Sequence, residues 1–215
     1  MLSGYLETQP PTVATWQSLY DLYNILGSIA AVVVFSYFVF LMIRYRRRKN
    51  SPPVQHHAEE PWGNWKKILL TLTITGSVLF VVTYQTFNSE SLLIPPQSPD
   101  AIRIGVIGQQ FSWTFVYPNG ARVVGNLTVP EGKTIILNIT SVDVAHSLGI
   151  PGLAVGMDAI PGRYNNAWFT APNDHVVYTI RCKELCGPGH AFMIGKVTVV
   201  DQTAYANWYA SMGTN

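Results

Sequence analysis

Residues 25–43 read ILGSIAAVVVFSYFVFLMI and residues 68–87 read ILLTLTITGSVLFVVTYQTF, and neither stretch contains a charged residue. A membrane hydrocarbon core about 30 Å thick is spanned by roughly 20 apolar residues of helix, so each stretch is long enough to cross alone. The alternative is a pair of buried core helices, but the neighbouring sequence offers no large polar shell to enclose them. The sequence therefore predicts two transmembrane helices, at residues 25–43 and 68–87.

The connection between the two stretches is strongly basic. Residues 44–67 contain seven of the chain's 14 Lys and Arg residues, whereas the first 24 residues contain none. Basic loops favour the cytoplasmic side of a membrane. We therefore expect a cytoplasmic loop at residues 44–67, with the N-terminal segment (residues 1–24), the C-terminus and the domain after the second span on the opposite, exported face. Because no basic residue precedes the first span, a cleaved signal peptide is not expected.

The composition of the whole chain excludes several classes of protein. Of its 215 residues 48% are hydrophobic and 12% are charged, and the mean hydropathy is +0.17. Ordinary soluble domains carry about 25% charged residues, and a disordered chain has far fewer apolar ones. The net charge of +2 is small and no basic stripe is interleaved with aromatic residues, so a nucleic-acid partner is not expected.

Beyond a Pro- and Ser-rich linker at residues 88–100, the sequence changes to short runs of alternating polarity separated by turn signals. The candidate strands are residues 102–107, 111–117, 121–129, 134–139, 176–181 and 196–200. Regularly spaced short strands are typical of an all-β sandwich or barrel. We expect this domain at residues 101–201, followed by a C-terminal helix and tail at residues 202–215.

Both cysteines of the chain lie in one segment, Cys182-Lys-Glu-Leu-Cys186-Gly-Pro-Gly-His190-Ala-Phe-Met193. Thiolate, imidazole and thioether are soft ligands, which suit copper and do not suit magnesium or calcium. Zinc accepts two Cys and a His but seldom a thioether. A mononuclear blue-copper site uses one Cys, so two thiolates imply two bridging sulfurs and two copper ions. With no open position for substrate, such a site is suited to electron transfer.

A second imidazole is needed from elsewhere in the chain. His56 and His57 lie in the predicted cytoplasmic loop, and His175 lies beside Asn173-Asp174 in a sequence typical of a surface. His146 follows the end of a candidate strand and is the best remaining ligand.

The alternative for the two cysteines is a disulfide, which is reasonable on an exported face. A bridge between Cys182 and Cys186 closes a very small loop, however, and stabilises little. It also leaves His190 and Met193 without a role. The metal site is the favoured interpretation.

With the two spans before them, the segments Asp143–Ser147 (DVAHS), Asp158–Arg163 (DAIPGR) and Cys182–Met193 resemble subunit II of haem–copper cytochrome c oxidases, over nearly the whole chain. The resemblance implies a two-helix transmembrane hairpin followed by an all-β, cupredoxin-like Greek-key barrel that carries the dinuclear copper centre CuA. The implied copper ligands are His146, Cys182, Cys186, His190, Met193 and the backbone carbonyl of Glu184. The Glu184 side chain matches a glutamate that helps hold magnesium at the contact with subunit I.

The same resemblance implies where an electron donor docks. Asp158 matches a family position near the cytochrome c docking surface, although a turn carboxylate is the simpler interpretation. The family usually has Gly-x-Gln-Trp-x-Trp where this chain has Phe111 and Trp113 at the two aromatic positions. From residue 88 onward the chain has 8 acids and 7 bases, a net charge of −1. That charge gives little steering unless the acids cluster, so we expect an apolar docking face with a weak dependence on salt.

A weaker resemblance concerns the start of the second span. Glu59 or Glu60, with Trp62 following, is similar to the Glu-x-x-Trp sequence that leads into the second helix of the family. The family's glutamate lies near the mouth of a proton-uptake channel in subunit I. The alternative is an acid at the N-terminal turn of a helix, which is the better interpretation.

The resemblance implies a subunit of a terminal cytochrome c oxidase, a proton-translocating oxidoreductase. An external cytochrome c or small copper protein would reduce the dicopper centre, which passes electrons to haem in subunit I for oxygen reduction and proton pumping. No catalytic residue and no oxygen chemistry is expected in this chain itself. The alternatives are a CuA-bearing subunit of a nitric oxide reductase, a membrane-tethered copper-carrying protein, a quinol oxidase subunit, which would lack the copper ligands, and a disulfide-containing adhesion domain.

Overall fold

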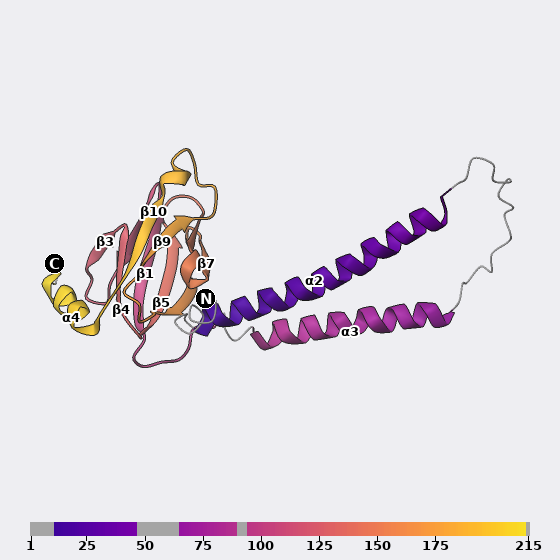
Figure 1. Cartoon of the computed structure of the whole chain (residues 1–215). Helices are drawn as coiled ribbons and strands as arrows, with labels where there is room; N and C mark the ends of the chain where they lie inside the picture. The colour runs from indigo at the N-terminus through magenta and orange to yellow at the C-terminus, as the bar shows by residue number, and fades with distance from the viewer. Residues whose placement is uncertain (1–10, 47–64, 90–93, 214–215) are drawn as a thin grey trace. The chain divides into compact units, whose positions relative to one another are not determined.

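The computed structural model of the chain describes residues 11–46, 65–89 and 94–213. Its contacts divide the chain into two compact units (Figure 1). One unit is helical and its described residues lie within Ser18–Ser89. The other contains the β-strands, and its described residues are 11–17 and 94–213.

The helical unit contains α2 (Pro11–Arg44) from Ser18 onward and all of α3 (Trp65–Ser89). By length and composition both are candidate membrane spans, and no residue of their apolar windows is buried. Helix α2 begins well before Ile25, where the apolar stretch starts. At 1.5 Å per residue it is about 51 Å long, so it extends beyond a hydrocarbon core of about 30 Å. The predicted span at residues 25–43 therefore covers the apolar part of α2 and omits its first turns.

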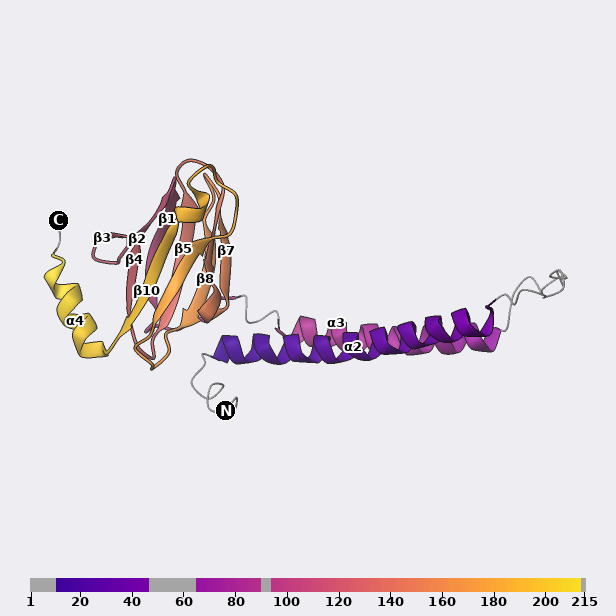
Figure 2. The same cartoon turned by 45° about the horizontal axis from the view of Figure 1, so that its top comes forward.

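A polar contact joins the two helices. The Tyr23 hydroxyl lies 2.6 Å from Thr86 Oγ1. Since the Thr86 hydroxyl donates to the Val82 carbonyl oxygen at 2.9 Å, Tyr23 is the donor to Thr86. Residues near the start of α2 and the end of α3 thus lie side by side, as a hairpin requires (Figures 1 and 2).

The described residues of the β unit form ten strands in two five-stranded sheets. The strands are β1 (Ile102–Gln109), β2 (Ser112–Val116), β3 (Arg122–Val124), β4 (Asn126–Pro130), β5 (Thr134–Ser141), β6 (His146–Ile150), β7 (Val155–Ala159), β8 (Asn165–Thr170), β9 (Val177–Cys182) and β10 (Ile194–Val200). The first sheet has the order β3-β2-β1-β5-β8 (Figure 2). The second has the order β4-β10-β9-β6-β7. The predicted all-β domain is confirmed.

The structure differs from the predicted strands in two ways. The single strand expected at residues 121–129 is two strands, β3 and β4, which lie in different sheets. Between them Gly125 has a φ of +76°, which glycine adopts at little cost, and this turn moves the chain from one sheet to the other. The structure also contains β6, β7 and β8, which the alternation of polarity did not indicate, because every residue of β6 is buried and β7 contains Gly156.

The two sheets enclose one apolar core and are also joined by a buried tyrosine. Tyr117, which follows β2 and is 2% exposed, donates from its hydroxyl to the Thr128 carbonyl oxygen at 2.9 Å. The same hydroxyl accepts from the Thr128 N–H at 2.8 Å. Burial is the main cause that raises the pKa of Tyr117 far above its ordinary value. The neutral phenol therefore fastens the end of the first sheet to β4 of the second.

Substituting Tyr117→Phe is expected to lower the free energy of unfolding of the domain by about 1–3 kcal/mol, because it leaves two backbone groups of Thr128 buried without their partner. Chemical denaturation of the variant and the parent measures this difference. The control is Tyr164→Phe, since the Tyr164 side chain is 74% exposed and its hydroxyl should add nothing measurable. Equal stability of the two variants would show that the Tyr117 hydroxyl does not fasten the sheets.

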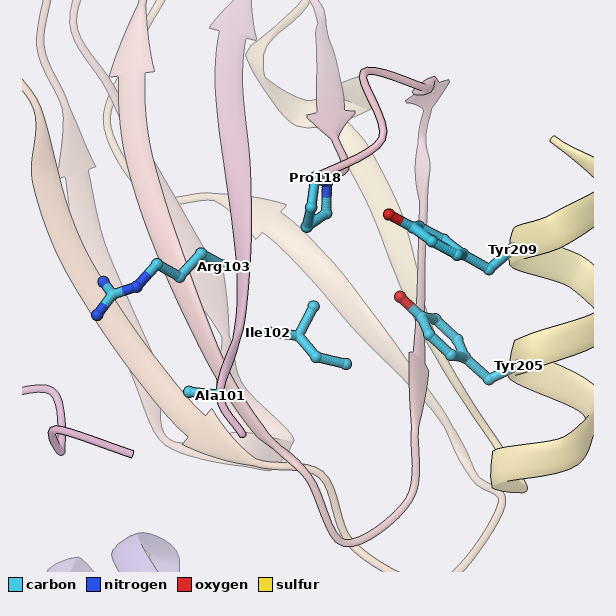
Figure 3. Close-up of a pocket in the computed structure, with 6 residues that line it drawn as sticks. All are labelled: Ala101, Ile102, Arg103, Pro118, Tyr205 and Tyr209. Carbon is cyan, nitrogen blue, oxygen red and sulfur yellow. The ribbon is translucent and has the colours of Figure 1, made fainter. Parts of the chain in front are cut away.

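The last helix is α4 (Gln202–Ser211). Asp201 caps its N-terminus, because the Asp201 side chain accepts a hydrogen bond from the Ala204 N–H at 2.7 Å. Aromatic side chains hold it to the barrel, and the Trp208 and Tyr117 rings meet edge-on with centroids 5.1 Å apart. Beside this contact Tyr205 and Tyr209 line an open, largely apolar pocket of about 420 Å³ (Figure 3). The other lining residues are Ala101, Ile102, Arg103 and Pro118. None of these six residues is among the predicted metal ligands.

Candidate metal centre

The predicted ligands come together at one end of the second sheet. His146 is the first residue of β6 and Cys182 is the last residue of β9. The strands β6 and β9 pair with Leu148 opposite Cys182, which brings His146 to the chain segment that follows β9. In that segment Cys186 is followed by the short 3₁₀ helix His190–Phe192 and by Met193, which directly precedes β10.

The distances between donor atoms fit a shared metal site. The Sγ atoms of Cys182 and Cys186 are 3.9 Å apart, and both thiols are free, so the disulfide alternative is not adopted. The Cys186 Sγ lies 3.6 Å from His190 Nδ1 and 3.8 Å from Met193 Sδ. Metal–nitrogen and metal–sulfur bonds of about 2.0–2.3 Å place the ligands of a tetrahedral ion roughly 3.3–3.8 Å apart. The spacing is therefore close to what bound ions would impose.

The Cys182 thiol makes the remaining contacts of the group. Its Sγ lies 3.9 Å from His146 Nδ1 and 3.2 Å from the Glu184 carbonyl oxygen. The nearest donor atoms of His146, Cys182 and Cys186 all lie within 4.8 Å of one another. Two thiols, two imidazoles and a thioether form a donor set that fits copper, with the Glu184 carbonyl oxygen as an additional hard donor.

Four of the donor side chains are buried, and His190 is half-buried. His146 and Met193 have no exposed surface, Cys186 is 5% exposed and Cys182 is 9% exposed. Burial, followed by the neighbouring Cys182, raises the pKa of the Cys186 thiol, so without metal it is protonated at neutral pH. A metal ion must displace that proton to bind.

A carboxylate that was not predicted as a site residue orients the buried imidazole. Asp143 Oδ1 lies 2.8 Å from His146 Nε2, which directs His146 Nδ1 toward the thiols. Partial burial raises the pKa of Asp143, but the hydrogen bonds from the Gln110 N–H, the His146 ring, the Val144 N–H and the Ser141 hydroxyl outweigh it and lower that pKa to about 2. Asp143 is therefore ionised across the physiological range.

Gln110 connects the carboxylate with the cysteine segment. Its N–H donates to Asp143 Oδ2 at 2.7 Å, and its side-chain amide donates to the Cys186 carbonyl oxygen at 2.6 Å. Sequence reasoning missed both residues as supports of the site. A carboxylate three residues before a candidate histidine was an available signal for Asp143, because metal-bound histidines commonly donate to a carboxylate. No comparable signal identified Gln110.

Two aromatic residues adjoin the centre in different ways. The Trp113 ring is fully buried and meets the His146 ring edge-on, with centroids 6.0 Å apart. A Cβ on Gly108 would lie 3.1 Å from both rings, so a larger residue there would require one of the rings to shift. Phe111 is 37% exposed, and its ring lies so close to the backbone of Gly189 that a Cβ there would overlap it. Of the two, only Phe111 presents surface to another protein.

The other residues singled out in the sequence lie outside this cluster. Asp158 is exposed on β7, and the Glu184 side chain is exposed beyond the backbone carbonyl that approaches Cys182. His175 is a surface residue, as expected, and pairs with Glu131 at 2.7 Å. The remaining residues singled out, His56, His57, Glu59 and Glu60, lie outside the described residues.

Comparison with known proteins gives three concordant matches. The family profile for the periplasmic domain of cytochrome c oxidase subunit II matches residues 121–200. A heme-copper oxidase subunit 2 of Aeropyrum pernix is 35% identical over 94% of this chain and 91% of that protein. A cytochrome c oxidase subunit 2 of Alkalihalophilus pseudofirmus is 31% identical over 91% of this chain, which spans 59% of that longer relative.

The fold of the β unit also matches a solved structure. The crystal structure of the periplasmic domain of cytochrome oxidase subunit II (CoxB) of Bradyrhizobium japonicum superposes with a TM-score of 0.52 at 29% identity, covering 55% of this chain and 96% of that one. The predicted cupredoxin-like fold is confirmed by this match. Two candidate spans and a match to a periplasmic domain support a membrane-anchored protein with an extracytoplasmic domain. The chain belongs to the cytochrome c oxidase subunit II family.

Proposed function

We propose that this chain is the subunit through which electrons enter a terminal cytochrome c oxidase, and that it holds two copper ions as a CuA centre. The observation that carries this proposal is the pair of free, buried thiols of Cys182 and Cys186, 3.9 Å apart. The electrons pass to haem in a separate subunit I, where oxygen is reduced and protons are pumped. This chain contributes no oxygen chemistry of its own.

The proposed ligands are His146, Cys182, Cys186, His190, Met193 and the backbone carbonyl of Glu184. When bound, the copper pair supplies a one-electron acceptor with little change of geometry. The protein's part is to hold its donor atoms rigidly and to exclude water, since His146 and Met193 are fully buried. Such burial supports electron transfer and disfavours a copper carrier, which must release its metal.

The donor is proposed to be a cytochrome c or a small copper protein. Apolar side chains surround the approach to the centre, with Leu185 and Phe192 about 80% exposed and Phe111 beside the cysteine segment. Phe111 is the proposed point of electron transfer from the donor, Trp113 supports His146, and Asp158 lies at the docking surface. The exposed Glu184 side chain is proposed to help hold magnesium at the contact with subunit I.

Metal analysis and electron spin resonance of the purified, copper-loaded protein test the proposal. We expect two copper ions per chain that share one unpaired electron, because two thiolates can bridge both ions. One copper ion that exchanges freely with a chelator would instead favour the copper carrier. A colourless protein with Cys182 joined to Cys186 would remove the metal site altogether.

A further inference from the structure

Three basic side chains lie together on the outer face of the second sheet. They are Arg181 in β9, Lys183 directly after it, and Lys196 in β10. β9 and β10 are antiparallel, with Lys196 opposite Thr179. Residues opposite one another share a face of a sheet, as do residues two apart on one strand. The three cations therefore point to the same side, all three are exposed, and we name them the basic strip.

The charge of the basic strip is not neutralised within the described part of the chain. None of its three members forms an ion pair with another described residue. Among the outward-facing residues of the strands of this sheet there is one carboxylate, Asp158 on the edge strand β7. Glu184 lies beyond the strand end, in the cysteine segment. A net charge of −1 from residue 88 onward thus conceals a local excess of positive charge.

Lys183 is held in place by the sheet beneath it. Gly149 of β6 and Gly156 of β7 stand opposite one another. A Cβ on Gly149 would lie 2.7 Å from the Lys183 Cγ, and one on Gly156 would lie 3.1 Å from its Nζ. The Lys183 stem therefore crosses this pair of glycines, while its N–H donates to the Ser147 carbonyl oxygen at 2.8 Å. Its ammonium group is a positioned charge beside a proposed copper ligand.

We infer that the basic strip docks the acidic face of the protein that delivers electrons to the copper centre, an inference that rests on the proposed function. The strip begins next to Cys182, and Ile194, which stands opposite Arg181, directly follows Met193. A protein seated on the strip therefore has its redox group close to the copper end. Complementary charges raise the rate of association and fix its orientation. The donor that fits has carboxylates around its redox group, and a basic donor is repelled.

The test uses one donor with two surface charges, cytochrome c in its basic form and the same protein with its lysines succinylated. Stopped-flow spectroscopy follows reduction of the copper centre in the purified oxidase complex. For the acidic form we expect a rate constant that falls steeply with added salt, in contrast to the weak salt dependence expected from the net charge alone. The double substitution R181Q/K196Q should lower that constant by roughly tenfold at low salt, within the range of electrostatic steering. The matched control R103Q/R122Q makes the same change of net charge on β1 and β3 of the first sheet.

Each result of this test bears on the inference. A tenfold loss in R181Q/K196Q, with the control within twofold of wild type and an unchanged copper spectrum, supports it. Equal effects of the two double variants, or no effect of either, would overturn it. Loss of R181Q/K196Q from the purified complex would also overturn it, because the strip would then contact another subunit. Failure of both donor forms to reduce the wild-type copper centre would instead contradict the proposed function.

Discussion

Substituting Cys186→Ser is expected to abolish the spectrum of the paired copper centre while the barrel remains folded. Cys186 Sγ lies 3.6–3.9 Å from His190 Nδ1, Met193 Sδ and Cys182 Sγ, so it is the sulfur that links most of the donor set. A serine hydroxyl is a hard, weakly acidic ligand and does not replace a bridging thiolate for copper. What remains is at most a single ion held by one thiolate, as in a blue-copper site.

Metal analysis, visible absorption and electron spin resonance measure this change. We expect the copper content to fall from two ions to one or none, and the signal of a shared electron to disappear. Cys182→Ser should have the same effect, because two thiolates are needed to bridge two ions. The far-ultraviolet circular dichroism of the metal-free variants should match that of the parent. An intact dinuclear spectrum in Cys186→Ser would refute the assignment of the bridge.

The ligands that lie close together in the sequence could be predicted from the sequence alone. Cys182, Cys186, His190 and Met193 lie within twelve residues, so their spacing alone indicated a soft metal site. His146 lies 36 residues before Cys182 and is brought there by the pairing of β6 with β9. It could be selected only by eliminating the other histidines.

The residues that support the ligands could not be predicted in the same way. Gln110 acts through a hydrogen bond to the carbonyl of Cys186, 76 residues away. Such contacts depend on which strand ends meet, and the strand order was not predictable because β6, β7 and β8 lack a regular alternation of polarity. The basic strip was hidden for the same reason, since Arg181 and Lys196 become neighbours only through the pairing of β9 with β10. Net charge does not report such clustering.

Phe111 is both partly exposed and in contact with the segment that carries the proposed copper ligands, as a residue that receives electrons from a donor should be. Its ring covers the backbone of Gly189 and approaches that of Gly187, the residues just before the proposed ligand His190. Its remaining surface, 37% of the side chain, is open to a partner. A partly exposed aromatic ring in an interface is a typical hot spot.

Substituting Phe111→Ala is therefore expected to lower the second-order rate constant for copper reduction by about 30-fold, which corresponds to about 2 kcal/mol for loss of a hot-spot side chain. Stopped-flow reduction of the oxidase complex measures the constant. The control is Tyr164→Ala, which removes a 74% exposed aromatic ring elsewhere in the domain and should leave the rate within twofold.

The variant Phe111→Trp tests whether an aromatic ring at this position is sufficient for the reaction with the donor. Tryptophan is the residue that the resemblance gives for this position. A rate at or above that of the parent is expected, since the ring is open to solvent on one side and the larger indole can extend there. Loss of the copper spectrum in Phe111→Ala would assign Phe111 to holding the cysteine segment and not to electron transfer. An unchanged spectrum with an unchanged rate would show that electrons do not enter through Phe111. The exposed side chains of Phe192 and Leu185 would then be the next candidates.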